Sequence, residues 1–204
     1  MSDQPDDVEL YAGDSGEEWQ ERRARGIGAS EAAAALGLSQ YMTPLELYLR
    51  KRRETPPVEE TRDMLWGKLV EPAVVKLYEA THDVPLRYPL PLTEHPKHPI
   101  VLATGDAELS PTVGVEIKSM QFYGFRRIQT MGLADAAPQF LIQCQQQMAV
   151  MGWDAVVLVV LVDRSLHEFT VERDDALIDD VICADLELWQ RIESGNPPPI
   201  DFSR

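Results

Sequence analysis

Hydrophobic positions recur at a helical period in some segments of this chain and form an uninterrupted run in another. Apolar residues recur every three or four positions over residues 138–151 and 174–193, which predicts a helix in each segment. The second helix is expected to end at Gly195, because glycine commonly follows the last helical turn. Residues 155–162 (AVVLVVLV) are continuously apolar, which indicates a strand covered on both faces, and a further strand is expected over 166–171.

Helix signals also dominate the first third of the chain. Residues 17–25 have a helical pattern, and the sequence GIG at 26–28 interrupts it. Ser30 follows, and we expect it to cap a helix over 31–36.

Two more helices are expected before residue 82. Thr43, Pro44 and Glu46 are typical of the N-cap, first and third positions of a helix, here over 45–53. A longer helix is expected over 61–81, where Pro72 indicates a kink or restart. Glu71 lies outside its i,i+4 apolar row, which consists of Leu65, Leu69, Ala73 and Leu77.

The central segment predicts the fold class. Between residues 83 and 120 the pattern changes to short β-like runs, notably 100–104 and 113–118. Together with the helices and the later strands, these runs predict an α/β domain with a central mixed β-sheet flanked by helices. We expect a single domain over 16–204, preceded by a loose acidic arm over 1–15.

Charge is distributed unevenly along the 204 residues, whose formal net charge is −15. A protein that binds phosphates uses Lys and Arg, so this total disfavours DNA binding. The segment 19–53 nevertheless has seven basic and three acidic residues, whereas 172–193 has eight acidic and two basic ones. One surface could therefore attract DNA, although solvated helix faces would explain the same runs.

Composition excludes several other classes of protein. No stretch of the sequence is apolar for the ~20 residues that a membrane helix needs, and Met1 to Leu10 is acidic where a secretory signal would be basic and then apolar. We therefore expect a cytoplasmic protein. The two cysteines, Cys144 and Cys183, lie far apart and indicate neither a disulfide framework nor a zinc site.

One short motif carries candidate chemistry. In a strand over 113–118, the period of two places Glu116 and Lys118 on one face. If the turn at Pro111 forms a symmetric hairpin, Asp106 lies opposite Glu116. Two facing carboxylates repel each other unless a divalent cation such as Mg²⁺ lies between them, so the arrangement indicates a metal site. A solvent-exposed hairpin with a Glu/Lys face is the alternative, because the spacing alone is a weak signal.

Several blocks in order resemble the YqaJ-type viral recombinase family, which includes the phage lambda exonuclease and belongs to the PD-(D/E)xK nucleases. Trp19 to Ser30 (WQERRARGIGAS) is similar to the family's opening block, and Trp66 to Glu71 (WGKLVE) to its WGxxxE helix. Thr104-Gly105-Asp106 and Glu116-Ile117-Lys118 match the nuclease core. The sequence from Gln143 (QCQQ) matches its QxQ helix, so the resemblance covers about residues 19–162.

The resemblance implies roles for individual residues. Asp106, Glu116, Glu71 and the Ile117 carbonyl would hold the metal, and Lys118 would act on the nucleophilic water. Arg23 and Ser30 would bind a terminal 5′-phosphate, and Thr104 and Gln143 could line the same pocket. Without the family, Glu71 would be a surface acid paired with Lys68, and Gln143 a solvated helix residue.

The resemblance also implies an activity and partners. The expected activity is a Mg²⁺-dependent 5′-to-3′ exonuclease, with Mn²⁺ as a substitute, that resects linear double-stranded DNA to 5′-mononucleotides and a 3′ overhang for recombination. A phage or prophage setting, a single-strand annealing protein as partner and a ring-shaped homotrimer are further implications. A related endonuclease, a 3′-acting nuclease and a catalytically silent DNA-binding module remain alternatives.

Overall fold

The computed structural model describes residues 17–56 and 58–200, so the arm expected over 1–15 lies outside the described residues. The described helices are α1 (Glu17–Arg23), α2 (Ala29–Ala35), α3 (Pro44–Lys51), α4 (Arg62–His82), α5 (Phe122–Met131), α6 (Leu133–Ala136), α7 (Pro138–Met151) and α8 (Asp175–Ser194). The strands are β1 (Ile27–Gly28), β2 (Thr93–Glu94), β3 (Val101–Ala103), β4 (Ala107–Ser110), β5 (Val113–Ser119), β6 (Ala155–Val162) and β7 (Ser165–Glu172).

The larger sheet has the order β4-β5-β6-β7. Strands β5 and β6 are parallel, whereas β4 and β7 run antiparallel to their neighbours, so the sheet is mixed. A smaller sheet has the order β1-β3-β2. The predicted α/β class with a mixed sheet flanked by helices is therefore confirmed.

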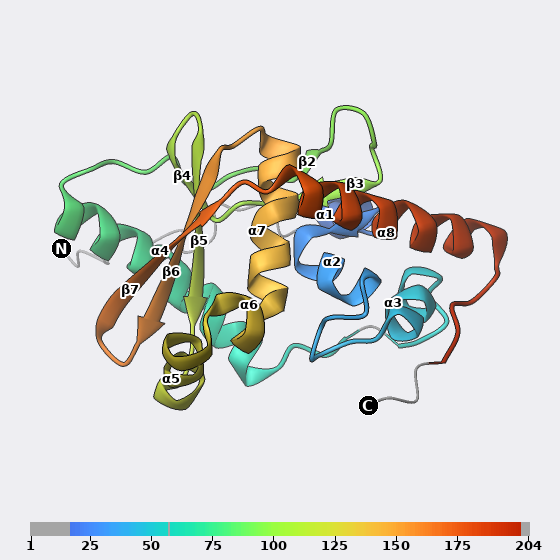
Figure 1. Ribbon diagram of the computed structural model, residues 1–204, viewed down its shortest axis with the longest axis horizontal. Helices are drawn as coiled ribbons and strands as arrows, with labels where there is room; N and C mark the ends of the chain where they lie inside the picture. The colour runs from blue at the N-terminus through green and yellow to red at the C-terminus, as the bar shows by residue number, and fades with distance from the viewer. Residues whose placement is uncertain (1–16, 57, 201–204) are drawn as a thin grey trace, which may run out of the picture.

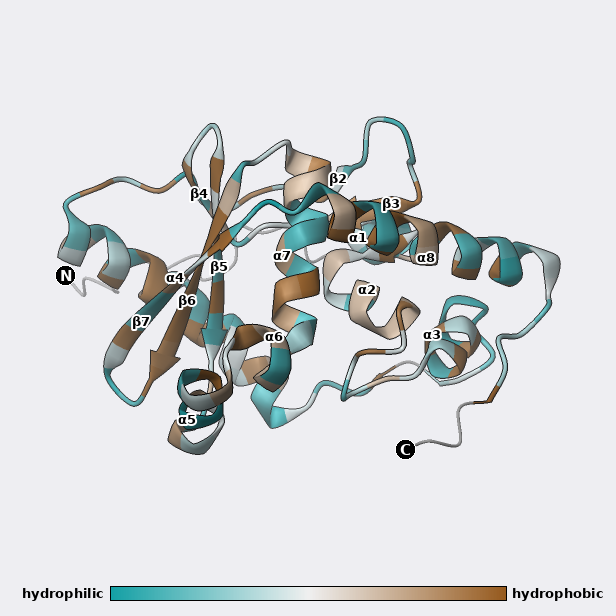
Figure 2. Cartoon of the chain, in the orientation of Figure 1, coloured by the Kyte–Doolittle hydropathy of each residue, from teal (hydrophilic) through white to brown (hydrophobic). Residues whose placement is uncertain are grey.

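Helix α7 occupies the middle of the molecule (Figure 1). It completes the crossover that joins the parallel strands β5 and β6, and it contacts both of them as well as α2, α8 and β3. Apolar residues concentrate in β5, β6 and the centre of α7, whereas the outward side of α8 is hydrophilic (Figure 2). Because α7 contacts structure on so many sides, even its glutamines at 143, 145, 146 and 147 are buried.

Most predicted elements are present with boundaries within two residues, but the start of α2 differs. The N-cap is Gly28 and not Ser30, because the carboxylate of Glu31 accepts a hydrogen bond from the Gly28 backbone N–H (2.9 Å). Ser30 therefore lies in the first turn, with an exposed side chain. The capping box at Thr43, Pro44 and Glu46 is confirmed.

Helix α4 is continuous through Pro72, and its buried face differs from the apolar row in the sequence. Val74, Val75 and Tyr78 are buried against the sheet. The row of Leu65, Leu69, Ala73 and Leu77 is exposed. None of the described helices is both long enough and apolar enough to cross a membrane.

Candidate active site

The β4–β5 hairpin places the two predicted carboxylates opposite each other. Ala107 pairs with Val115 and Glu108 with Gly114, and continuing this register brings Asp106 opposite Glu116. The backbone N–H of Ile117 donates to Asp106 Oδ2 (2.7 Å), which fixes that carboxylate against β5. The hairpin is not symmetric about Pro111, because the turn at residues 111 and 112 pairs Ser110 with Val113. A β-bulge between Glu108 and Ser110 then shifts the register by one residue, and this shift brings Asp106 opposite Glu116.

Glu116 is almost completely buried, with 1% of its surface exposed, so the alternative of a solvent-exposed Glu/Lys face is wrong. Three side chains donate hydrogen bonds to its carboxylate. Lys118 and Gln143 (2.5 Å) donate to Oε1, and Gln147 donates to Oε2 (2.5 Å). Burial of a charge requires such partners, and here two of the three come from α7.

The side chain of Glu71, on α4, lies near the carboxylates of Asp106 and Glu116. Burial raises its pKa to about 6, and the nearby charge of Glu116 contributes. Burial, Glu116 and Glu71 likewise raise the pKa of Asp106 well above its ordinary value. Lys68 pairs with Glu60 and not with Glu71, contrary to the alternative in which Glu71 is a surface acid paired with Lys68. The structure therefore brings all three predicted acids within electrostatic range of one another.

Lys118 completes this cluster. Burial by itself would lower its pKa, but the charges of Glu116 and Asp106 raise it overall. Its ammonium group also lies 5.5 Å from the centre of the Phe140 ring, so it contacts α7 as well as its own strand.

The donor chemistry of this cluster fits a hard divalent cation, because three carboxylates supply oxygen ligands. Among the residues that the structure describes, no three acidic, histidine or cysteine side chains already converge on one metal position. Side-chain donors instead contact both oxygens of Glu116. Metal binding would require these side chains to reorient, with Asp106, Glu116, Glu71 and the Ile117 carbonyl as the candidate ligands.

The four residues expected to bind a terminal phosphate lie in two places. Arg23 Nη2 donates to Ser30 Oγ (2.9 Å), so these two form one cluster. The guanidinium of Arg23 also lies 5.1 Å from the centre of the Trp19 ring. Gln143 instead contacts Glu116, and the Thr104 carbonyl accepts from Gln147 (3.0 Å). Helix α7 connects the two places, because Gln146 donates to the carbonyls of Ile27 (2.9 Å) and Leu102 (3.0 Å).

Comparison with known proteins identifies the family. The model of the YqaJ-like viral recombinase domain matches residues 18–154, which is more than half of the chain. The chain belongs to the YqaJ-like viral recombinase domain family. This range includes both ends of the candidate site, from Arg23 to Gln147.

Individual proteins are similar to this chain in sequence or in fold. The chain is 28% identical over 195 residues to the uncharacterized protein YqaJ of Bacillus subtilis (strain 168), covering 93% of this chain and 60% of the relative. The chain thus spans 60% of that relative's length. The fold is similar to that of an alkaline exonuclease (LHK-Exo) from Laribacter hongkongensis, with a TM-score of 0.75, 23% identity and coverage of 89% and 94% of the two chains. A phage related exonuclease from Haemophilus somnus 129PT has a TM-score of 0.66, with 14% identity and coverage of 83% and 96%.

Several residues that the structure places in the site are not indicated by the sequence. Gln147 holds both Glu116 and the Thr104 carbonyl, yet in the sequence it is one of several neighbouring glutamines. Glu31 is buried and contacts three basic side chains, which only the tertiary contacts of α2 with α1 and α3 reveal. A charged residue within the alanine-rich segment 29–35 was the available signal.

Proposed function

We propose that this chain is a metal-dependent DNA exonuclease. The observation that carries the proposal is the convergence of Asp106, Glu116, Glu71 and Lys118 where the β4–β5 hairpin faces α4 and α7. Membership of the YqaJ-like family supports it, and so does a fold shared with an alkaline exonuclease. That exonuclease also has a structure in complex with dAMP, a mononucleotide.

The proposed cofactor is Mg²⁺, with Mn²⁺ as a substitute. A divalent ion at such a site lowers the pKa of a bound water and offsets charge on the scissile phosphate. The side chains of Asp106, Glu116 and Glu71 would hold this ion, while Gln143 and Gln147 keep the Glu116 carboxylate in place. Lys118, as an ammonium beside these acids, would orient the attacking water and the phosphate.

We propose the 5′-to-3′ direction because of the second cluster. The guanidinium of Arg23 and the exposed hydroxyl of Ser30 are suited to a terminal 5′-phosphate. A chain that holds this phosphate while cutting nearby would release 5′-mononucleotides and leave a 3′ single strand. A single-strand annealing protein as partner, a ring-shaped homotrimer and a cytoplasmic phage or prophage setting complete the proposal, on the family resemblance alone.

The test is digestion of linear duplexes labelled at the 5′ or the 3′ end, with Mg²⁺ present or removed by EDTA. We expect Mg²⁺-dependent release of 5′-labelled mononucleotides first, while a closed circular duplex survives. Cutting of the circle would instead favour an endonuclease, and early loss of the 3′ label a 3′-acting nuclease. Absence of any digestion would favour a DNA-binding module without catalytic activity.

A further inference from the structure

The basic run Arg50 to Arg53 at the end of α3 has no role in the proposal so far. The basic side chains of this run contact different helices. Arg52 Nη1 donates to the Ile192 carbonyl of α8 (2.8 Å), and its Nε contacts Glu54. Arg50 and Lys51 instead contact Glu31 of α2, beside the proposed phosphate pocket. The run therefore divides into a part that fixes α8 and a part that faces α2.

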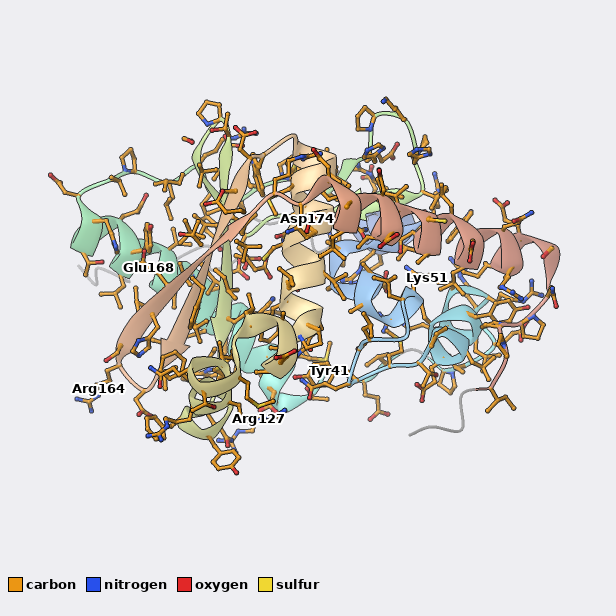
Figure 3. The ribbon with its side chains drawn as sticks, in the orientation of Figure 1. Tyr41, Lys51, Arg127, Arg164, Glu168 and Asp174 are labelled. Atoms are coloured by element: carbon orange, nitrogen blue, oxygen red, sulfur yellow. The ribbon has the colours of Figure 1, made fainter. Side chains whose placement is uncertain are left out.

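Glu31 is the common partner of three basic side chains. Lys51 Nζ lies 2.7 Å from its Oε2, while Arg50 Nη2 (3.4 Å) and Arg23 Nη2 (4.0 Å) lie near its Oε1. Burial would raise the pKa of Glu31, but the charges of Lys51 and Arg23 lower it overall, so the acid is ionised. Lys51 lies where α3 meets α2 (Figure 3).

The four charged side chains of this cluster differ in solvent exposure. The side chains of Glu31 and Lys51 are only 3% and 5% exposed, and Lys51 also donates to the Arg23 carbonyl (3.1 Å). Arg23 and Arg50 are 28% and 39% exposed. The two arginines can therefore be reached by a ligand, whereas Glu31 and Lys51 are buried, and Glu31 contacts both arginines from the protein interior.

Both arginines approach the same oxygen of Glu31, so their guanidinium groups lie close together. Ser30, bonded to Arg23, adds an exposed hydroxyl donor at the same place. Three cations and one carboxylate leave a local charge of about +2 in a chain whose net charge is −15. A terminal phosphate monoester carries about −1.5 to −2 at neutral pH, whereas an internal diester carries about −1.

We propose that Arg50 is a second phosphate-binding residue of this pocket, and that buried Glu31 positions Arg50 and Arg23 for a terminal phosphate monoester. The inference rests on the proposed 5′-phosphate pocket. Matching charge makes the pair selective for the end of a strand over its interior phosphates. It also explains why an acid occupies the centre of a site for an anion: it holds together cations that would otherwise repel one another.

The experiment compares binding of two hairpin duplexes that differ only in a 5′-phosphate or a 5′-hydroxyl, in EDTA so that no cleavage occurs. Arg50→Gln should reduce the preference for the phosphorylated end about tenfold, since it removes a charge-assisted hydrogen bond. Arg53→Gln is the matched control, because it removes the same charge from an exposed position in the same run. Its preference should stay within about twofold of that of the unmodified chain.

Glu31→Gln tests the positioning role. If it folds, as judged by its circular dichroism spectrum, it should lose the phosphate preference although Glu31 itself is buried behind the arginines. Equal preferences for Arg50→Gln and Arg53→Gln, or no preference in the unmodified chain, would overturn the inference. Failure of the nuclease proposal has a different signature, because Mg²⁺-dependent digestion would be absent while the binding preference and its loss in Arg50→Gln remained.

Discussion

Partly exposed Lys118 and buried Glu116 form an ion pair on one strand, and the two residues have different neighbours. Glu116 is fixed by Gln143 and Gln147 of α7, whereas Lys118 lies at the edge of the cluster over the Phe140 ring. A buried acid with several donors keeps its place when one donor is lost, at a cost of about 1–3 kcal/mol. The structure of the site therefore depends more on the glutamines, and its chemistry on the lysine.

Replacing Lys118 tests whether this lysine contributes to the chemistry of the site and not to its structure. Lys118→Ala should lower cleavage by about two or more orders of magnitude, because the ammonium that orients the water and phosphate is lost, while duplex binding changes little. Single-turnover cleavage and fluorescence binding measure the two effects. Lys76→Ala, an exposed lysine of α4, is the control and should match the unmodified chain. Full cleavage by Lys118→Ala would reject its catalytic role.

At the scale of elements, the hairpin that aligns the carboxylates packs tightly against a tryptophan. A Cβ added at Gly114 would lie 2.1 Å from Trp153 Cζ3, and one added at Gly105 would lie 2.5 Å from Trp153 Cη2. The Trp153 ring is fully buried, and its Nε1 donates to Glu108 Oε2 of β4 (3.2 Å). Gly114 in β5 and Gly105 in the segment between β3 and β4 thus let the ring lie directly against the backbone beside Asp106 and Glu116.

Gly114→Ala should therefore destabilise the chain by about 1–3 kcal/mol or more, because the buried ring cannot move aside. Gly67→Ala is the matched control, since no atom lies within 4 Å of its added Cβ. Gly67 lies inside α4, where alanine is preferred by about 0.5–1 kcal/mol, so this variant should be slightly stabilised. Urea unfolding distinguishes the two, and similar midpoints would contradict the packing argument.

Helix α8 carries a buried acid that the periodicity of the sequence did not indicate. Burial raises the pKa of Asp185 well above its ordinary value, and the charge of Glu31 adds to this effect. The charge of Lys51 and the nearby side chain of Gln146 lower this pKa in part. Both oxygens of Asp185 and Oε1 of Gln146 nevertheless lack a hydrogen-bond donor in good geometry among the described residues. A proton on Asp185 would supply the bond between them, so we infer that the acid is neutral and joins α8 to α7.

The pH dependence of folding follows from this raised pKa. The unfolded chain releases the Asp185 proton near pH 4, whereas the folded chain retains it, so stability falls as pH rises from about 4 through the higher folded value. Asp185→Asn cannot ionise and should be more stable than the unmodified chain at pH 7–8, by about 1 kcal/mol or more. This advantage should shrink toward pH 4 in thermal unfolding. A less stable variant at neutral pH would show that Asp185 is instead ionised.

For the whole molecule, the distribution of charge matters more than its sum. The acidic segment over 172–193 forms α8 and the end of β7, whereas the cluster of Arg23 and Arg50 lies on α1 and α3. Since α8 contacts α2 and α3, its exposed acids are close enough to weaken the attraction of DNA to the basic cluster at low salt.

Neutralising exposed acids of α8 tests this effect. Asp179→Asn with Asp180→Asn should raise the association rate with duplex DNA about two- to tenfold at low salt, because repulsion of the approaching phosphates is reduced. The difference should disappear near 0.5 M salt, where screening extends only a few ångströms. Stopped-flow association measures it, and an unchanged rate at low salt would show that α8 lies outside the path of the DNA.

Local patterns predicted most elements correctly for a clear physical reason. The helix at 138–151, the strand at 155–162 and the capping box at Thr43 depend on residues near in sequence, so their signals are complete within short windows. Asp106 does lie opposite Glu116 as expected, but the turn at Pro111 alone does not set this register, because a β-bulge between Glu108 and Ser110 shifts it by one residue. Helices α5 and α6, by contrast, were not predicted, because no side chain caps the start of either helix, although α5 does bury Phe125 and Ile128 on one face.

The sequence alone therefore determined the α/β class, the carboxylate pair and its lysine. Only the tertiary structure decided which faces are buried, since burial depends on what packs against an element from elsewhere in the chain. The exposed apolar row of α4, the buried glutamines of α7 and the buried acids Glu31 and Asp185 all follow from such contacts. Residues 20 to 160 positions apart come together in this way, as in the ion pair of Glu31 with Lys51 or the two neighbouring acids Glu31 and Asp185. Such contacts produce no periodic pattern in the sequence.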